Sequence, residues 1–470
     1  MLKKILGLTV ILMFSIIGFS ETDISQIASD YPYKDSAIMA TVLGTPANQH
    51  YQFKNAKGPK VRKFKTTKKI PEILRQWSDY DYGVWTQNKK APLMILISGT
   101  GSLYSSGLSL YIANVFYDRG YNVITFSSPT TMPYIVSQSK NRYAGYIKDE
   151  TEQLYSLIQK AVLQEKNNGM KIDKIYTGGY SLGGFQSILI HEMDDRNNRK
   201  IGIEKSLLLN SPVSILNSTR KLDDFLVKNG IYDARSLEKY LDTIFSKLMY
   251  DKSIKIKDIE FSDLKTSLGK LGLGEKDFEV LIGLMFRFYS ANMTFAGEVF
   301  SGENAVGRLS HKKSYKRFDS VTEEFKEGLS VSFDEYSTEI LYPYLKKNKN
   351  PDLSLDDFVN EFDLRHVQSF IDKNNKNVQN DIIKILGGFA DMTDFETACD
   401  LFFQYYLKRP DLYMEFYNAV NSYFVINKYS LYNNYSTQIT FFEKIIEYSN
   451  DWKQELIVLL FFEVARDFLK

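Results

Sequence analysis

The residues best suited to chemistry are a serine and its flanking glycines, in the stretch IYTGGYSLGGFQ at residues 175–186. Gly179, Ser181 and Gly183 form the pattern G-x-S-x-G, which is typical of a serine held on a sharp turn between a strand and a helix. A serine hydroxyl attacks a carbonyl carbon effectively only when a neighbouring base takes its proton. The pattern therefore indicates Ser181 as a catalytic nucleophile and calls for a base, commonly a histidine, of which the chain has four.

The elements on either side of Ser181 fit such a turn. KIYTG, before the serine, predicts a strand, and SLGGFQSILIHEM, which begins at the serine, predicts a helix. Gly183 and Gly184 then fall in the first helical turn, where each costs about 1 kcal/mol relative to alanine. A close approach between the strand and the helix would offset this loss. The alternative is a glycine-rich turn that carries an ordinary serine.

A second glycine-rich stretch, ISGTGS at residues 97–102, follows an earlier predicted strand. The oxyanion of a tetrahedral intermediate needs two backbone N–H donors, one from the residue after the serine and one from the loop after the third strand. We therefore expect Leu182 and Thr100 to form an oxyanion hole. Gly99 and Gly101 would let the main chain approach the substrate, and the alternative is again a simple strand-to-helix turn.

Strand and helix signals alternate over residues 91–215 in a way that the rest of the chain does not show. Alternation at this spacing predicts a mostly parallel sheet connected by helices, an α/β fold. The predicted strands are residues 93–98, 121–129, 174–178 and 205–213, and the predicted helices are residues 108–120, 149–167 and 181–193.

A strand followed by ISGTGS, a strand followed by FSSP, the stretch KIDKIYTGGYSLGG, a strand followed by LLNSP and a helical region together resemble the α/β-hydrolase superfamily. The resemblance covers roughly residues 90–215. It implies a sheet of about eight strands, a serine nucleophile, an acid after the seventh strand and a histidine after the eighth. By motif, Ser181, Leu182 and Thr100 correspond to family positions. No residue corresponds to the histidine.

The sequence changes near residue 214 to consecutive helical segments rich in Tyr, Phe and Leu. We expect residues 214–450 to form a helical cap inserted into an α/β core that begins with residues 21–213. The aromatic residues of the cap either line an apolar pocket or pack the helices together. LIVLLFF, within residues 451–470, predicts a return to a core strand, after which the sequence ends eight residues later.

If LIVLLFF is the seventh strand, Glu463 and Asp467 are the available acids. Three interpretations fit the missing strand and histidine: a serine hydrolase whose sequence is cut short or frame-shifted near residue 460, a hydrolase fold that binds a ligand without turning it over, or an enzyme that takes its base from the cap. The well-formed elbow and oxyanion loop favour the first.

The four histidines differ in how they could serve Ser181. His191 lies on the same predicted helix, about 15 Å along its axis at 1.5 Å per residue, so it is outside the reach of about 3 Å that a base needs. His50 precedes the sheet core. His311 and His366 belong to the predicted cap, which would have to bring one of them over the serine.

The first twenty residues, MLKKILGLTVILMFSIIGFS, place two lysines before an apolar run and predict a cleavable export signal at residues 1–20. A signal anchor that stays in the membrane is the alternative. No cysteine follows this run that could carry a lipid, and Cys399, the lone cysteine, cannot form an internal disulfide. We expect a periplasmic or extracellular protein, soluble or peripherally associated with a membrane.

Charge and composition limit the kinds of molecule that the protein is expected to bind. Without the two lysines of the signal, the chain has 57 basic and 57 acidic side chains, so no net charge would attract nucleic acid. A basic run at residues 54–69 could contact phosphates, or it could be a solvated strand pair, which we favour. Four scattered histidines and one cysteine predict no metal site, and no cofactor is expected.

The sequence thus predicts an exported serine hydrolase acting on a small-molecule ester or lipid, with a non-catalytic ligand-binding or partner-binding protein as the alternative.

Overall fold

The computed structural model of the chain describes residues 38, 42 and 53–363, except for residues 251–272 and a few single positions (67, 210, 213, 306, 308–310 and 313). The predicted signal peptide, the end of the predicted cap and the predicted strand at residues 456–462 lie outside the described residues. The same holds for Cys399, Glu463 and Asp467.

A six-stranded sheet in the order β1-β2-β4-β3-β5-β6 forms the core of the described chain. The first two pairings, β1 with β2 and β2 with β4, are antiparallel, and the remaining strands are parallel. This sheet confirms the predicted α/β class. The strands are β1 (Lys60–Lys65), β2 (Asp79–Trp85), β3 (Ala91–Ile97), β4 (Asn122–Phe126), β5 (Ile172–Tyr180) and β6 (Ile203–Leu209).

The central strands are buried because their sequences are nearly continuous apolar runs, as parallel strands covered on both faces require. All five residues of β4 are buried, and six of seven in β3. β1 forms one edge of the sheet, and it holds much of the basic run at residues 54–69. Its lysines protect the edge from pairing with another chain. Arg62 and Lys63 pair with Glu165 and Asp79, each at 3.0 Å, so the favoured strand-pair interpretation fits.

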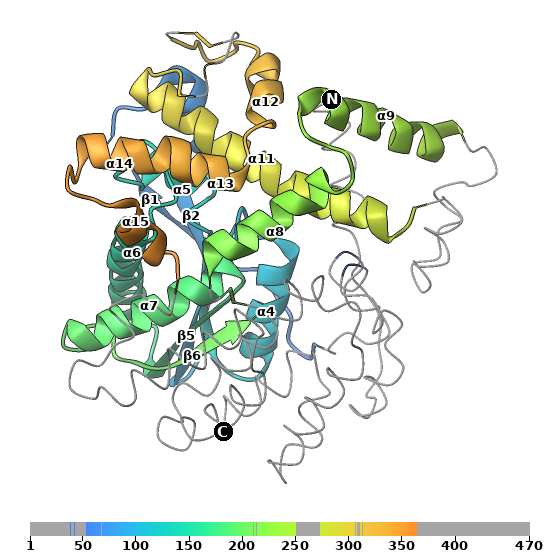
Figure 1. Cartoon of the computed structure of the whole chain (residues 1–470). Coiled ribbons are helices and arrows are strands. Elements are labelled where there is room, and N and C mark those ends of the chain that lie inside the picture. The colour runs from blue at the N-terminus through green and yellow to red at the C-terminus, as the bar shows by residue number, and fades with distance from the viewer. Residues whose placement is uncertain are drawn as a thin grey trace, which may run out of the picture.

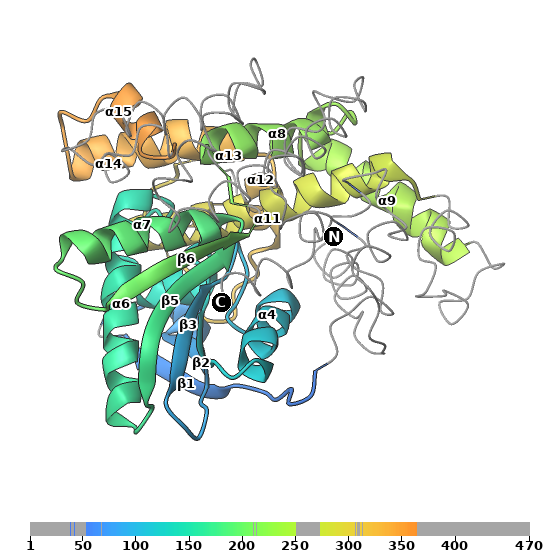
Figure 2. The same ribbon diagram turned by 90° about the horizontal axis from the view of Figure 1, so that it is seen from below.

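Helices cover both faces of the sheet, with α6 and α7 on one side and α4 on the other (Figure 2). Their bounds are α4 (Gly107–Asp118), α6 (Ile147–Asn167) and α7 (Leu182–Arg196), close to the predicted helices. One difference is α5 (Met132–Ser137), in a segment that reads as a polar loop. A helix of six residues is too short to show a repeating apolar period, although a proline in its first turn marks its start.

Residues 214–363 add a helical region that lies over the end of the sheet where Ser181 is found (Figures 1 and 2). The two ends of this region meet beside β6: the N–H of Ile215 donates to the carbonyl oxygen of Phe362 at 2.9 Å, and Ser214 forms a β-bridge with Asp363. Its elements are α8 (Ile215–Val227), α9 (Ala234–Tyr250), α11 (Glu275–Ser301), α12 (Thr322–Gly328), α13 (Phe333–Glu335), the π-helical turn η5 (Tyr336–Leu341), α14 (Tyr342–Asn348) and α15 (Leu355–Asn360). A short 3-10 helix, η2 (Glu72–Trp77), lies between β1 and β2.

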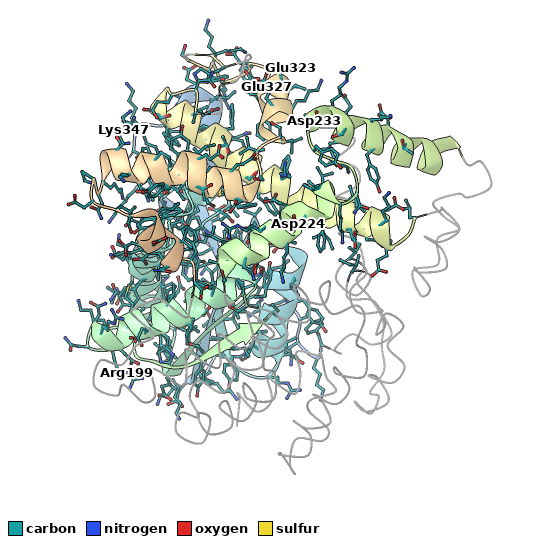
Figure 3. The ribbon with its side chains drawn as sticks, in the orientation of Figure 1. Arg199, Asp224, Asp233, Glu323, Glu327 and Lys347 are labelled. Carbon is teal, nitrogen blue, oxygen red and sulfur yellow. The ribbon has the colours of Figure 1, made fainter. Side chains whose placement is uncertain are left out.

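The helical region is held by aromatic packing and by one buried ion pair. Phe295 and Phe325 pack with ring centroids 5.2 Å apart, and Arg287 donates to Asp223 at 2.9 Å inside the region. Charged side chains such as Asp233 and Lys347 lie on its outside (Figure 3).

Candidate active site

Ser181 stands at the corner between β5 and α7. Its backbone has φ 53° and ψ −128°, a conformation that residues with a side chain rarely adopt and that costs about 1–3 kcal/mol. The N–H of Gly184 donates to the carbonyl oxygen of Ser181 at 2.9 Å, so the helix begins immediately after the serine. Strain of this kind persists only where the surrounding structure fixes it.

The glycines around Ser181 let the strand and the helix pass closely. A Cβ atom added to Gly183 would lie 2.1 Å from the carbonyl oxygen of Ile97, and one added to Gly179 would lie 2.4 Å from the carbonyl carbon of Gly183. Both positions therefore need glycine. Gly184 is less restricted, with the Cβ of Ser211 at 3.0 Å.

The loop after β3 lies against this corner because β3 and β5 are neighbours in register, with Ile97 opposite Gly179. A Cβ atom on Gly99 would be 2.9 Å from the carbonyl oxygen of Tyr180, the residue before the serine. Gly101 has a φ of 69°, and its N–H donates to Thr130 Oγ1 at 2.8 Å. The parallel pairing thus brings together a serine on a strained strand-to-helix turn after β5 and a glycine loop after β3, which is the arrangement of a nucleophile elbow and its oxyanion loop.

The strand order, the corner at Ser181 and the loop beside it have the arrangement of the α/β-hydrolase fold. Thr100 and Leu182, the two expected oxyanion donors of that fold, line one cavity of about 50 Å³. Leu182 is the first residue of α7, so its N–H has no acceptor within the helix. Among the described residues, no backbone carbonyl accepts the N–H of Thr100.

Most of the cavity wall comes from apolar side chains of the helical region, including Leu216 of α8, Phe286 and Met293 of α11, and Leu341 of η5. Tyr289 of α11 packs on the oxyanion loop: a Cβ atom added to Gly101 would lie 2.0 Å from its ring. Burial raises the pKa of the Tyr289 phenol to about 12. The α/β-hydrolase core and the helical region therefore enclose the cavity together.

The structure does not bring a histidine to Ser181 within the described chain. The hydroxyl of Ser181 has no hydrogen-bond partner among the described residues. His191 is buried, and its Nδ1 lies 2.8 Å from Ser206 Oγ, away from the corner, as the helix spacing predicts. The ring of His311 packs on Tyr315, which in turn packs on Phe295 of α11.

His50 and His366 lie outside the described residues. So do the candidate acids Glu463 and Asp467. The described part of the chain contains no group of three or more His, Cys, Asp or Glu side chains that could hold a metal ion. Nor does any helix in that part combine the length and apolar character needed to cross a membrane.

Sequence reasoning missed Glu150, which lines the same cavity as Thr100 and Leu182. It lies in the first turn of α6, where an acid ordinarily interacts with the helix dipole at the surface, so its sequence position gave no signal. Burial raises the pKa of its carboxyl group to about 8, although the N–H of Gly145, which donates to Oε1 at 2.5 Å, opposes this shift.

Comparisons with known proteins add little to this fold. No family model matches the chain, and no curated protein matches it. Among solved structures, the chain is similar to EstE1, a thermostable carboxylesterase cloned from a metagenomic library, at 13% identity and a TM-score of 0.26. The aligned part covers 43% of this chain and 61% of that one.

Two further similar structures are an esterase of Rhizomucor miehei and an acylaminoacyl peptidase of Pyrococcus horikoshii. The identities are 13% and 14%, and the TM-scores are 0.24 and 0.25. The aligned parts cover 42% and 36% of this chain, and 55% and 25% of the other two. The chain thus spans less than two thirds of the length of these structures. Since the TM-scores are low, the fold assignment rests on the strand order, the corner at Ser181 and the loop beside it.

Proposed function

We propose that this protein is an exported serine hydrolase that cleaves a small carboxylic ester through Ser181. The observation that carries the proposal is the strained backbone of Ser181, held beside a glycine loop and next to a cavity that Thr100 and Leu182 both line. A strained residue beside such a cavity is typical of a functional site, because an ordinary turn has no need to store strain.

The reaction would be acyl transfer. The Oγ of Ser181 adds to the carbonyl carbon and gives up its proton to a base, while the N–H groups of Leu182 and Thr100 donate to the oxyanion. The bond to the leaving alcohol then breaks, and the alcohol oxygen takes up a proton. Water adds to the acyl enzyme in the same way, which releases the acid and restores the hydroxyl.

The proposal is tested by labelling the purified protein with a fluorophosphonate probe and by measuring hydrolysis of short p-nitrophenyl esters. Wild-type protein should be labelled and active, and Ser181→Ala should be neither. Ser320→Ala is a matched control, because that exposed serine lies in the loop before α12 and should leave both signals unchanged. Labelling that persists in Ser181→Ala would remove this serine from the mechanism.

The second candidate function is a non-catalytic protein that binds an apolar ligand or a partner. It is favoured by one observation, that the wall of the cavity beside the corner is formed mainly by apolar side chains, which suits a bound apolar ligand. Purified protein that retains a hydrophobic ester unchanged over many hours, with no labelling at Ser181, would support this function over hydrolysis.

Export forms part of the proposal and rests on the sequence of residues 1–20. We expect the N-terminal sequence of the protein from its native host to begin after this segment. A protein that retains Met1 in the cytoplasmic fraction would contradict export and leave the proposed chemistry untouched.

A further inference from the structure

One buried carboxyl group has no role in the chemistry described above. Glu150 is fully buried in the first turn of α6. Its Oε1 accepts a hydrogen bond from the N–H of Gly145, but Oε2 is buried without a hydrogen-bond partner among the described residues. A buried polar atom without a hydrogen-bond partner destabilises the folded state, so its presence beside a cavity needs a reason.

The surroundings of Glu150 favour its neutral form. The cavity lining contains no Lys, Arg or His side chain among the described residues, so no cation stabilises a carboxylate there. Burial places the pKa at about 8, so the group carries a proton at neutral pH. Since Oε1 accepts from an amide, the proton belongs on Oε2, which makes Oε2 a hydrogen-bond donor.

The other polar groups of the cavity are already satisfied or belong to the oxyanion loop. The hydroxyl of Thr219 donates to the carbonyl oxygen of Leu216 at 3.0 Å, and that of Ser337 donates to the carbonyl oxygen of Phe333 at 2.8 Å. The hydroxyl of Thr130 lies 2.9 Å from that of Ser128. Glu150 therefore supplies a free donor in a cavity whose wall is otherwise mainly apolar.

The size of the cavity limits what it can hold. A volume of about 50 Å³ is roughly three to four times what one water molecule requires. An acyl group whose carbonyl lies at Thr100 and Leu182 can therefore place only a short chain beside Glu150.

We propose that this cavity binds the acyl part of the substrate and that Glu150 selects short acyl groups carrying a hydrogen-bond-accepting oxygen on the chain, such as an ether, keto or hydroxyl oxygen. This proposal rests on the proposed function of Ser181. It names a substrate class that the fold alone does not give, because the selecting group lies on α6 and not at the corner.

The test compares p-nitrophenyl methoxyacetate with p-nitrophenyl butyrate, two esters of equal chain length in which an ether oxygen replaces a methylene group. The quantity measured is the ratio of kcat/KM for the two esters, in wild-type protein, Glu150→Gln and Glu150→Met. The ether ester is intrinsically more reactive, but this factor cancels when the ratios are compared between variants.

Wild-type protein should favour the ether ester over the butyrate about ten- to a hundredfold more than Glu150→Met does, since the lost hydrogen bond leaves one partner unpaired. Glu150→Gln should keep most of the preference, because its amide can accept from Gly145 and donate to the ether oxygen. Equal ratios in wild type and Glu150→Met would overturn the proposal.

A binding measurement separates this proposal from the proposed function. In Ser181→Ala, which cannot turn over, the dissociation constants of ethyl methoxyacetate and ethyl butyrate should differ at least tenfold in favour of the ether, and Glu150→Met in that background should abolish the difference. If wild type hydrolyses no ester but this preference is found, Ser181 is not a nucleophile and Glu150 still selects the ligand. If Glu150→Met does not fold, the two dissociation constants measured in Ser181→Ala decide the question. Binding of the ether ester that is no tighter than binding of the butyrate then overturns the proposal.

Discussion

Replacing Ser181 with glycine or with alanine removes the hydroxyl in both cases, but the two variants should differ in stability. The backbone at this position has φ 53° and ψ −128°, a conformation that glycine adopts freely and that a Cβ atom opposes. Alanine keeps the strain, whereas glycine releases it. We therefore expect Ser181→Gly to be the more stable variant, although glycine normally weakens a folded protein.

The size of the difference follows from two opposing effects. Release of the strain contributes about 1–3 kcal/mol to the stability of Ser181→Gly relative to Ser181→Ala. The greater freedom of glycine in the unfolded chain costs about 0.4–1 kcal/mol. The free energy of unfolding of Ser181→Gly should thus exceed that of Ser181→Ala by about 1.3 kcal/mol at the midpoints of these ranges, and by at most about 2.6 kcal/mol.

The assay is urea unfolding followed by tryptophan fluorescence, since Trp85 is fully buried in β2. Ser156, in the interior of α6, provides the matched control, because there alanine should be more stable than glycine by about 1 kcal/mol. The order of the two substitutions should therefore reverse between positions 156 and 181. If alanine is the more stable residue at both positions, the backbone at Ser181 is not strained and the corner is not as described.

Three further outcomes are expected. Gly183→Ala should destabilise the fold by about 1–3 kcal/mol in urea unfolding and abolish probe labelling, because its Cβ would lie 2.1 Å from a backbone oxygen. Gly184→Ala is the control, and its free energy of unfolding should stay within about 1 kcal/mol of wild type. His191→Ala should lose about 1–3 kcal/mol of stability with its bond to Ser206 but keep full labelling, so lost labelling in a folded variant would mean that this histidine serves the reaction after all. The unfolded pKa of Glu150 is near 4.5 and the folded value is about 8, so the folded state holds the extra proton, and stability should fall as the pH rises through this interval. Glu150→Gln should show a smaller fall in urea unfolding between these pH values, and an unchanged slope would contradict a buried neutral carboxyl.

Local sequence signals were enough to predict the parallel strands and the corner. β3 is an apolar run of strand length, and the glycines at 179 and 183 mark a place where two backbones nearly touch. These features depend on residues close together in the sequence, so they can be recognised from the sequence alone. The carboxyl ends of parallel strands joined by helices lie at the same edge of the sheet. This rule places the loop after β3 beside Ser181, which follows β5.

The cavity could not be predicted in the same way, because it exists only through contacts between distant segments. Glu150 reads as an ordinary first-turn acid until residues from α8, α11 and η5 cover it. Tyr289 and Phe286 belong to a helix whose apolar pattern does not distinguish residues that pack in the core from residues that line a pocket. α5 could not be predicted either, because a helix of six residues is too short to leave an apolar period in the sequence.

The oxyanion loop is held from two directions, and this links the helical region to the chemistry. On one side Gly99 lies against the backbone of Tyr180, so the corner and the loop keep a fixed spacing. On the other side the ring of Tyr289 occupies the space where a side chain at Gly101 would be, so α11 presses on the same loop. A preorganised donor is effective only if it does not need to move. In the proposed reaction, α11 would therefore hold the Thr100 donor in place as well as form the wall that limits the acyl group.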